Sequence, residues 1–127
     1  MNDQEFEAVS NLAGNRRYAY AIKKIADWGI VWSLGADDGW VLAGDAEGSE
    51  VVPIWPHPQF AAACALGSWV GNAPRPIELA AWLEKWIPGM MRDQRRVAVF
   101  PTPTNKGIVV SATRLKDDLE AELSLIE

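Results

Sequence analysis

The strongest structural signal in the sequence is a β-hairpin early in the chain. Residues 30–34 are β-branched and aromatic, and residues 40–43 form a second apolar run. The Asp-Asp-Gly turn at 37–39 separates them, since Gly tolerates positive φ and Asp side chains bind the local backbone. A polar loop then leads to a third apolar run at 51–55. Three strands with two short connections favour an antiparallel β-meander.

Five segments have helical patterns, before and after these strands. Asn15 and Thr113 are expected N-caps, because their side chains can accept a backbone N–H. Gly29 is expected to end the second helix, since glycine favours the left-handed backbone that follows a helix. The expected helices lie at residues 3–12, between Asn15 and Gly29, at 59–66, from Pro76 to Pro88, and from Thr113 to the end of the chain.

Prolines set the expected limits of the fourth helix. Pro76 suits its first position, where a missing N–H costs nothing, and Pro88 with Gly89 is expected to end it. Residues 67–76 are expected to form a loop, and residues 90–96 a short helix or turn. The third helix is apolar almost all round, which predicts that it is buried.

A second pair of strands is expected at residues 97–100 and 107–111. The element order ααβββααββα predicts an α+β fold, with one antiparallel or mixed sheet covered by helices. The chain has 127 residues and no linker-like tract, so we expect a single domain over residues 1–127.

Composition and charge exclude several classes of protein. A formal net charge of −5, from 12 Lys and Arg against 17 Asp and Glu, argues against a nucleic-acid partner. One Cys and one His cannot close a disulfide or a structural zinc site, and no phosphate-binding glycine loop is present. We therefore expect no metal and no cofactor.

A membrane location is not expected either. Residues 51–74 contain no charged side chain, but prolines and glycines interrupt them too often for a spanning helix. The first residues are polar and acidic, unlike the basic start of a signal peptide. The expected location is the cytoplasm.

Seven tryptophans in a chain of this size are unusual. Trp32, Trp40 and Trp55 lie on the three strands of the expected meander, so they could meet on one face of the sheet. Tryptophan is enriched at protein interfaces because it supplies a large contact area with few rotatable bonds. These three are candidate binding residues, although burial tendencies favour a place in the core for most of the seven tryptophans.

His57, the only histidine, lies between Pro56 and Pro58. Catalysis with Cys64 is disfavoured, because seven residues of helix separate the two by ~10.5 Å. Cys64 also lies among alanines and leucines, which are the surroundings of an inert thiol. We expect His57 to cap a helix or bind a backbone group, and keep it as a candidate binding residue. No catalytic residue is assigned.

Short motifs rich in Trp and Pro follow one another along the chain. They are Trp32-Ser33-Leu34, Gly39-Trp40, Pro53-Ile54-Trp55-Pro56-His57, Cys64, Trp69, Trp86-Ile87-Pro88-Gly89 and Phe100-Pro101-Thr102. In this order, over about residues 6–123, the chain resembles the bacterial domain-of-unknown-function family 2750, which consists of small single-domain proteins. The resemblance implies a bacterial, soluble, stand-alone protein and supplies no activity or catalytic residue. More distantly, the element order is similar to the secretion-associated SseB-type domain, which does not establish function.

Two functional classes fit these observations. The first is a non-enzymatic protein-interaction domain, such as an accessory or immunity-type protein, whose acidic charge would favour a basic partner. The second is a small-molecule binder or enzyme that uses an aromatic recess near Trp55 and His57. A concave pocket that contains His57 and a second polar side chain would favour the second class. An exposed apolar surface would favour the first.

Overall fold

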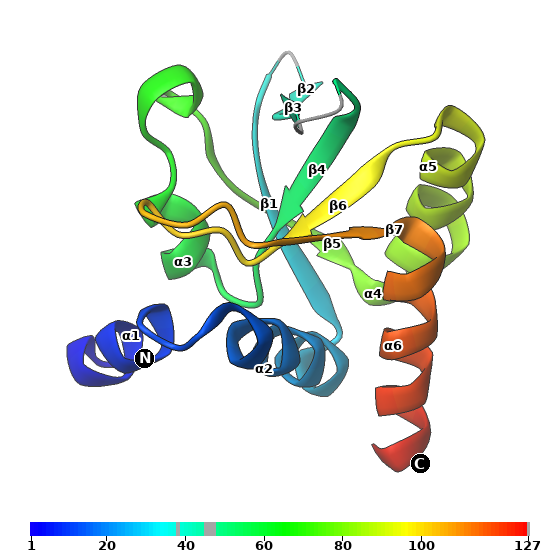
Figure 1. Ribbon diagram of the computed structural model, residues 1–127, viewed down its shortest axis with the longest axis horizontal. Helices are drawn as coiled ribbons and strands as arrows, with labels where there is room; N and C mark the ends of the chain where they lie inside the picture. Colours follow the sequence, from blue (N-terminus) through cyan, green and yellow to red (C-terminus); the bar gives the residue numbers. More distant parts are fainter. Residues whose placement is uncertain (38, 45–47, 127) are drawn as a thin grey trace.

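The computed structural model describes residues 1–37, 39–44 and 48–126, and it has an α+β architecture with two sheets (Figure 1). One sheet has the order β2-β1-β5 and is antiparallel. The other has the order β3-β4-β6-β7, in which only the β4–β6 pair is parallel. The strands are β1 (Ile30–Ala36), β2 (Gly39–Trp40), β3 (Ala43–Gly44), β4 (Glu50–Ile54), β5 (Ala73–Glu78), β6 (Arg96–Val99) and β7 (Ile108–Ser111).

Helices lie around both sheets, so the predicted α+β class is confirmed. In Figure 1, α1 and α2 lie below the strands, α3 to their left, and α5 and α6 to their right. The helices are α1 (Asp3–Ser10), α2 (Gly14–Trp28), α3 (Pro58–Ala63), the 3-10 turn η1 (Gly67–Trp69), α4 (Leu79–Ala81), the π-helical turn η2 (Trp82–Trp86), α5 (Ile87–Asp93) and α6 (Ala112–Ile126).

The predicted hairpin forms, but the predicted meander does not. β1 pairs with β2 through Gly35 opposite Trp40, across the expected turn, of which Asp38 lies outside the described residues. The third strand, β4, pairs instead with β3 and β6. The two sheets meet where Trp32 and Trp55 exchange backbone hydrogen bonds of 3.0 and 2.8 Å. The predicted meander is wrong because β4 pairs with β6, which lies more than 40 residues later in the chain. Local sequence patterns do not predict a pairing between such distant strands.

Strand β5 covers residues 73–78, where the sequence predicts the end of the loop at 67–76 and the start of a helix at Pro76. Pro74 and Pro76 lie opposite Leu34 and Trp32 on β1. Since proline has no N–H, both must occupy positions where the backbone nitrogen faces away from β1. The outer edge of β5 therefore lacks two donors, which protects it from pairing with another chain.

The fourth helical segment does not end at Pro88. Helix continues from Leu79 to Asp93, because the turn before the proline widens to a π-turn in which the Ile87 N–H binds the Trp82 carbonyl. A wider turn relieves the clash that proline normally makes with the preceding helical turn. The helix ends at Gln94, which adopts a left-handed φ of 57°.

Two predicted caps are also wrong. Ser111, not Thr113, caps α6, by accepting the Arg114 N–H at 3.1 Å. α2 begins at Gly14, one residue before Asn15, and no side chain caps it. Gly29 ends α2 with a φ of 71°, as predicted.

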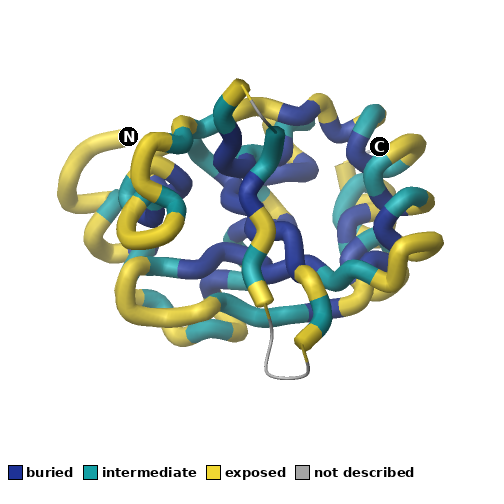
Figure 2. The backbone as a smooth tube through the Cα atoms, turned by 90° about the horizontal axis from the view of Figure 1, so that it is seen from above, coloured by how far each residue is buried: buried dark blue, intermediate teal, exposed yellow. Residues whose placement is uncertain are grey.

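The hydrophobic core lies between the sheets and the helices, and Figure 2 shows the buried backbone in the interior of the molecule. It includes Val52 on β4, Val97 on β6, and Leu115 and Leu119 on α6. The third helix is less buried than predicted, since Ala62 is exposed. Within the described ranges, no helix combines the length and apolar character needed to cross a membrane.

Candidate functional site

A groove lies on the face of the second sheet that points away from the core. Its volume is about 540 Å³. Four strands supply its floor, and Trp69 and the loop after β6 supply its walls. The lining residues are Ala43, Gly44, Val51, Trp69, Ala98, Pro101, Thr102, Pro103, Thr104, Asn105, Lys106 and Val109.

Strand alternation explains the apolar floor. Side chains on β4 and β6 point alternately to the two faces, so Val52 and Val97 enter the core while Val51 and Ala98 face the groove. Val51 and Ala98 are buried, yet neither belongs to the main core cluster. The floor extends over three strand spacings, from β3 to β7, which is a distance of roughly 14 Å.

Small residues make the floor deep. Ala98 and Ala43 each contribute only a methyl group. Ala43 faces the groove because it lies opposite Val51, whereas Gly44 lies opposite Glu50 and borders the groove with its backbone.

A strained loop, residues 100–107, forms one wall. Phe100 has a φ of +57°, which is unfavourable for a residue with a bulky side chain. Gly107 has a φ of +77°, and a Cβ there would lie 2.6 Å from the Val99 carbonyl oxygen. Thr102 and Asn105 close the loop through reciprocal backbone hydrogen bonds of 2.8 and 3.2 Å. Strain of this kind persists only when the surrounding structure holds it, and it concentrates at functional sites.

Buried Arg17 holds this loop from below. Its guanidinium donates to the Phe100 carbonyl at 3.1 Å, the Leu12 carbonyl at 2.8 Å and Asn105 Oδ1 at 2.8 Å. Asn105 Oδ1 also accepts the Gly107 N–H at 2.8 Å. A single arginine therefore ties the loop to α2.

Trp69 forms the opposite wall. Its ring meets the ring of Trp55 edge-on, with centroids 6.3 Å apart. The other side of Trp69 lines a smaller hollow of about 300 Å³, which Trp40 and Asn72 also line. Trp69 thus stands between two adjoining hollows and is half-buried, as aromatic residues at interfaces often are.

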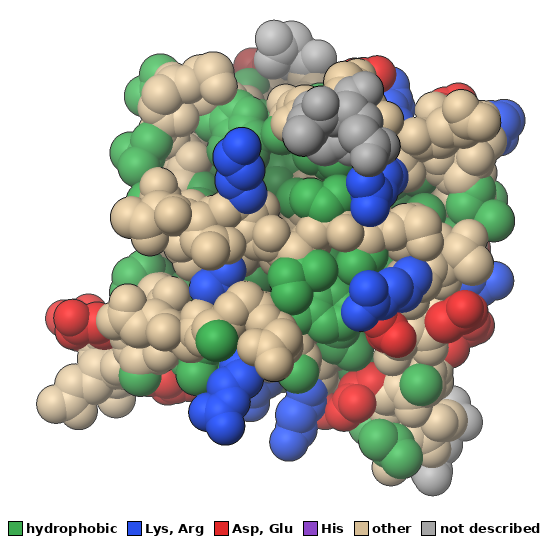
Figure 3. Space-filling model, in the orientation of Figure 1, with side chains coloured by type: hydrophobic (Ala, Val, Ile, Leu, Met, Phe, Trp, Pro, Cys, Tyr) green, Lys and Arg blue, Asp and Glu red, His purple; other side chains and the backbone are tan. Residues whose placement is uncertain are grey.

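Cationic side chains flank the apolar part of this face. Lys106 lines the groove, and Arg96 lies on the same face of β6 as Ala98, with Nη2 donating to the Val109 carbonyl at 3.4 Å. Figure 3 shows apolar surface in the upper centre of the molecule with Lys and Arg side chains on both sides. In the part of the chain that the structure describes, no three His, Cys, Asp or Glu side chains come together as metal ligands would.

Comparison with known families identifies the chain. The family model described as "Protein of unknown function (DUF2750)" matches residues 18–119, which is most of the sequence. The chain belongs to the DUF2750 family. A search of curated proteins found no significant match. The matched region of this DUF2750 protein contains every residue of the groove.

The tryptophans predicted to bind a partner are not gathered on one face. Trp55 is fully buried, and its indole Nε1 donates to the Pro101 carbonyl at 2.8 Å. Trp32 is half-buried and is linked to Trp55 through the backbone. Trp40 packs edge-on against Trp86, with ring centroids 4.9 Å apart. Trp32 and Trp55 are direct partners where the two sheets meet, whereas Trp40 lies opposite Gly35, so the prediction that all three gather on the face of one meander is wrong.

His57 caps α3 of this DUF2750 protein. Its Nδ1 accepts the Gln59 N–H at 3.2 Å. The imidazole also makes edge-on contacts with Trp28 and Phe60, at centroid distances of 6.0 and 6.2 Å. The expectation that His57 caps a helix is confirmed, and the groove-lining set does not include it.

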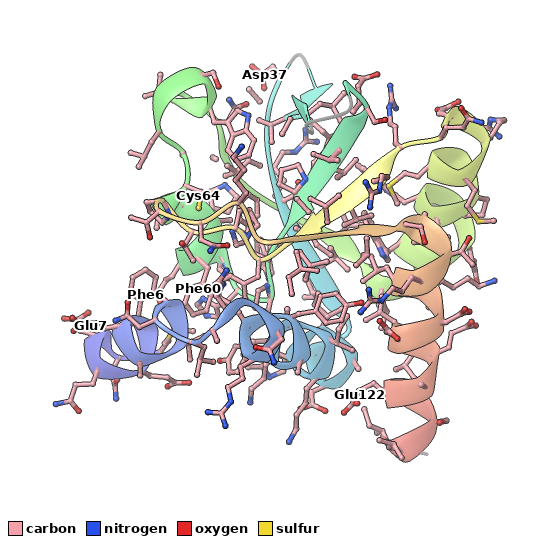
Figure 4. The ribbon with its side chains drawn as sticks, in the orientation of Figure 1. Phe6, Glu7, Asp37, Phe60, Cys64 and Glu122 are labelled. Carbon is pink, nitrogen blue, oxygen red and sulfur yellow. The ribbon has the colours of Figure 1, made fainter. Side chains whose placement is uncertain are left out.

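Cys64 lies under the strained loop (Figure 4). Its Sγ donates to the Pro101 carbonyl at 3.3 Å, beside the Trp55 indole that donates to the same oxygen. Burial raises the pKa of the Cys64 thiol to about 11, so the thiol stays protonated at neutral pH. Its role in this structure is to support the loop. Phe6 and Phe60 stack nearby, with centroids 5.0 Å apart, and join α1 to α3.

The cap at His57 predicts a pH dependence of stability. Burial, with a smaller contribution from the N-terminal amine, lowers the pKa of His57 below its usual value. The unfolded chain therefore binds the proton more readily, and stability is lost as the pH falls through about 6.5. The His57→Asn variant should keep the cap, lose the ring contacts, and be about 1 kcal/mol less stable at neutral pH.

Urea unfolding of both proteins between pH 8 and about pH 5 checks this expectation. The two free energies of unfolding should converge as the pH falls. If the difference between the two free energies of unfolding stays constant across this range, the pKa of His57 is not lowered by burial in the folded protein.

Proposed function

We propose that this DUF2750 protein is a protein-interaction domain that binds an extended segment of a partner in the groove beside Trp69. The observation that carries the proposal is an apolar floor on the outer face of a sheet, between a tryptophan and a strained loop. Apolar side chains that line a concave surface outside the core are typical of a binding site.

The dimensions of the groove favour an extended segment as its occupant. A floor of roughly 14 Å accommodates about four extended residues, since each advances the chain by ~3.3 Å. The walls contribute threonine, asparagine and backbone groups, which can satisfy the N–H and C=O groups of such a segment. Arg17 and the loop hydrogen bonds hold the site in place before binding, which lowers the entropy lost on association.

The Ala43→Leu variant tests the proposal directly. Ala43 lies opposite Val51 and shares its face of the sheet, so the larger side chain projects into the groove. Ala98→Leu fills the floor from β6 and is an independent second block. Ala121→Leu makes the same change on the exposed side of α6 and serves as the matched control.

Phage that display random short peptides would be selected on each protein after its fold is checked by circular dichroism. We expect the wild-type protein and Ala121→Leu to enrich the same peptides, and Ala43→Leu and Ala98→Leu to retain fewer than a tenth of them. Peptides that bind all four proteins equally, or no enrichment on the wild-type protein, would contradict the proposal.

A small apolar ligand is the second candidate for the same groove. The volume of about 540 Å³ lies in the range of small-molecule sites, and the floor is apolar. For this candidate the binding site is the groove beside Trp69, in place of the aromatic recess expected near Trp55 and His57. Mass spectrometry of compounds retained from a metabolite extract by the wild-type protein, but not by Ala43→Leu, would support it.

We further propose that the interaction takes place in the bacterial cytoplasm. Bacterial origin is what the family resemblance implies. The buried thiol of Cys64 is compatible with a reducing compartment.

A further inference from the structure

We infer that α1 controls the shape of the groove, because the loop at 100–107 keeps its strained form only while α1 is docked on α3. The inference goes beyond the proposed function, since it concerns the groove wall with or without an occupant. The observation that carries it is the position of residues 101–103, which have the groove on one side and α1 on the other.

Behind the groove wall lies a second hollow of about 120 Å³. Residues 101–103 line both spaces, so a single stretch of chain separates the groove from α1. In Figure 4, Phe6 and Phe60 lie between α1 and α3, below this loop. A wall that a neighbouring helix supports loses those contacts when the helix moves away. The other residues that line the second hollow are Phe6, Ser10, Phe60, Ala63 and Phe100.

A row of three aromatic rings connects α1 to the start of the loop. Phe6 stacks on Phe60 of α3 with centroids 5.0 Å apart, and Phe60 meets Phe100 with centroids 4.6 Å apart. Phe100 is the residue whose backbone is held at a φ of +57°. Because the packing around Phe100 maintains this unfavourable backbone, loss of Phe6 from the row removes part of its support.

Arg17 connects α1 to the far end of the loop. The Leu12 carbonyl, two residues after α1, accepts a hydrogen bond from the Arg17 guanidinium at 2.8 Å. Asn105 Oδ1 accepts from the same guanidinium at 2.8 Å and also accepts the Gly107 N–H. Since a buried guanidinium must keep its acceptors, a shift at Leu12 displaces Arg17 and is passed on to Asn105.

The small size of α1 allows it to exist in two states. It has eight residues, fewer than the roughly 12–15 that an isolated helix needs in water. Val9 is its buried residue and Phe6 is half-buried, so few contacts hold it in place. Its docked state is therefore balanced against a detached one, and a segment with two such states can change the shape of a second site.

Hydrogen exchange followed by NMR on the full chain tests the inference without any ligand. The N–H groups of Thr102 and Gly107 report on the loop, and the Asn11 N–H, which is bonded to the last turn of α1, reports on the helix. Phe6→Ala should raise the exchange rate at all three by about tenfold or more. Asn105→Ala acts from the loop side and should raise the exchange rate at Asn11.

Leu123→Ala is the matched control. Leu123 is also half-buried against the core but lies on α6, away from the loop (Figure 1). It should change the three exchange rates by less than about twofold, since these groups exchange through local opening. Faster exchange at Asn11 without a change at Thr102 and Gly107 would overturn the inference. Unchanged exchange at Asn11, or equal effects of Phe6→Ala and Leu123→Ala, would overturn it too.

Peptides selected on the wild-type protein then separate this inference from the proposed function. They should bind Phe6→Ala about tenfold more weakly than they bind the wild-type protein or Leu123→Ala. Groove-dependent peptides that bind Phe6→Ala as tightly as the wild-type protein would overturn the inference and leave the proposed function standing. If the loop and α1 loosen together but no peptide is enriched on the wild-type protein, the proposed function fails and control of the groove wall by α1 stands.

Discussion

Deletion of α6 from Thr113 onward is expected to abolish the cooperative unfolding of the whole chain. Leu115 and Leu119 are fully buried in the core between α2 and the second sheet. Loss of one buried leucine costs ~2–5 kcal/mol, and a domain of this size has only about 5–15 kcal/mol in total. Removing both, with the rest of the helix, should exceed that stability. The prediction tests whether residues 1–127 form a single cooperative unit.

A shorter deletion is the control for this experiment. Leu125 and Ile126 are 78% and 54% exposed, so the last turn of α6 contributes little to the core. Removal of residues 124–127 should therefore change the melting temperature little. A chain that ends at residue 112 and still shows sharp near-ultraviolet dichroism and a cooperative melt would contradict the account.

The Trp55→Ala variant is expected to lose ~3–5 kcal/mol of unfolding free energy, the largest effect of a single substitution that we predict. Trp55 is fully buried, supports Trp69 and donates to the Pro101 carbonyl. Its loss would leave a large cavity under both walls of the groove. Urea unfolding followed by far-ultraviolet dichroism measures this effect.

Two further variants separate packing from hydrogen bonding at this position. Trp55→Phe keeps much of the volume and should cost less than Trp55→Ala, because Cys64 still donates to the same carbonyl. Trp28→Ala removes a tryptophan that is 48% exposed and should cost well under half as much. Equal losses for Trp28→Ala and Trp55→Ala would show that Trp55 has no special structural role.

Local patterns in the sequence predict most of the elements but not their pairing. The hairpin at β1–β2 and the end of α2 at Gly29 depend on neighbouring residues, and both are predicted correctly. β5 was missed because two prolines in six residues suggest a loop, and only a partner such as β1 makes them acceptable at an edge. The helix beyond Pro88 was missed because a π-turn has no sequence signal of its own.

The candidate site was hardly predictable from the sequence. Trp69 lay in a segment expected to be a loop, and Asn105 and Arg17 meet across 88 residues of chain. The Phe-Pro-Thr motif at 100–102 and the glycine at 107 were visible, but the strain at Phe100 depends on tertiary contacts. The preference for Trp32, Trp40 and Trp55 followed from the number of tryptophans, whereas their burial depends on which strands pair.

The most direct test of the groove as a binding site is the response of the seven tryptophan indole N–H signals to a selected peptide. In ¹H–¹⁵N spectra, assigned with single Trp→Phe variants, we expect the Trp69 signal to shift most and the Trp40 signal, from the adjoining hollow, to shift less. The signals of Trp28 and Trp82, which lie outside the groove, should stay in place. A shift confined to Trp28, or none at Trp69 when the peptide is saturating, would contradict the account.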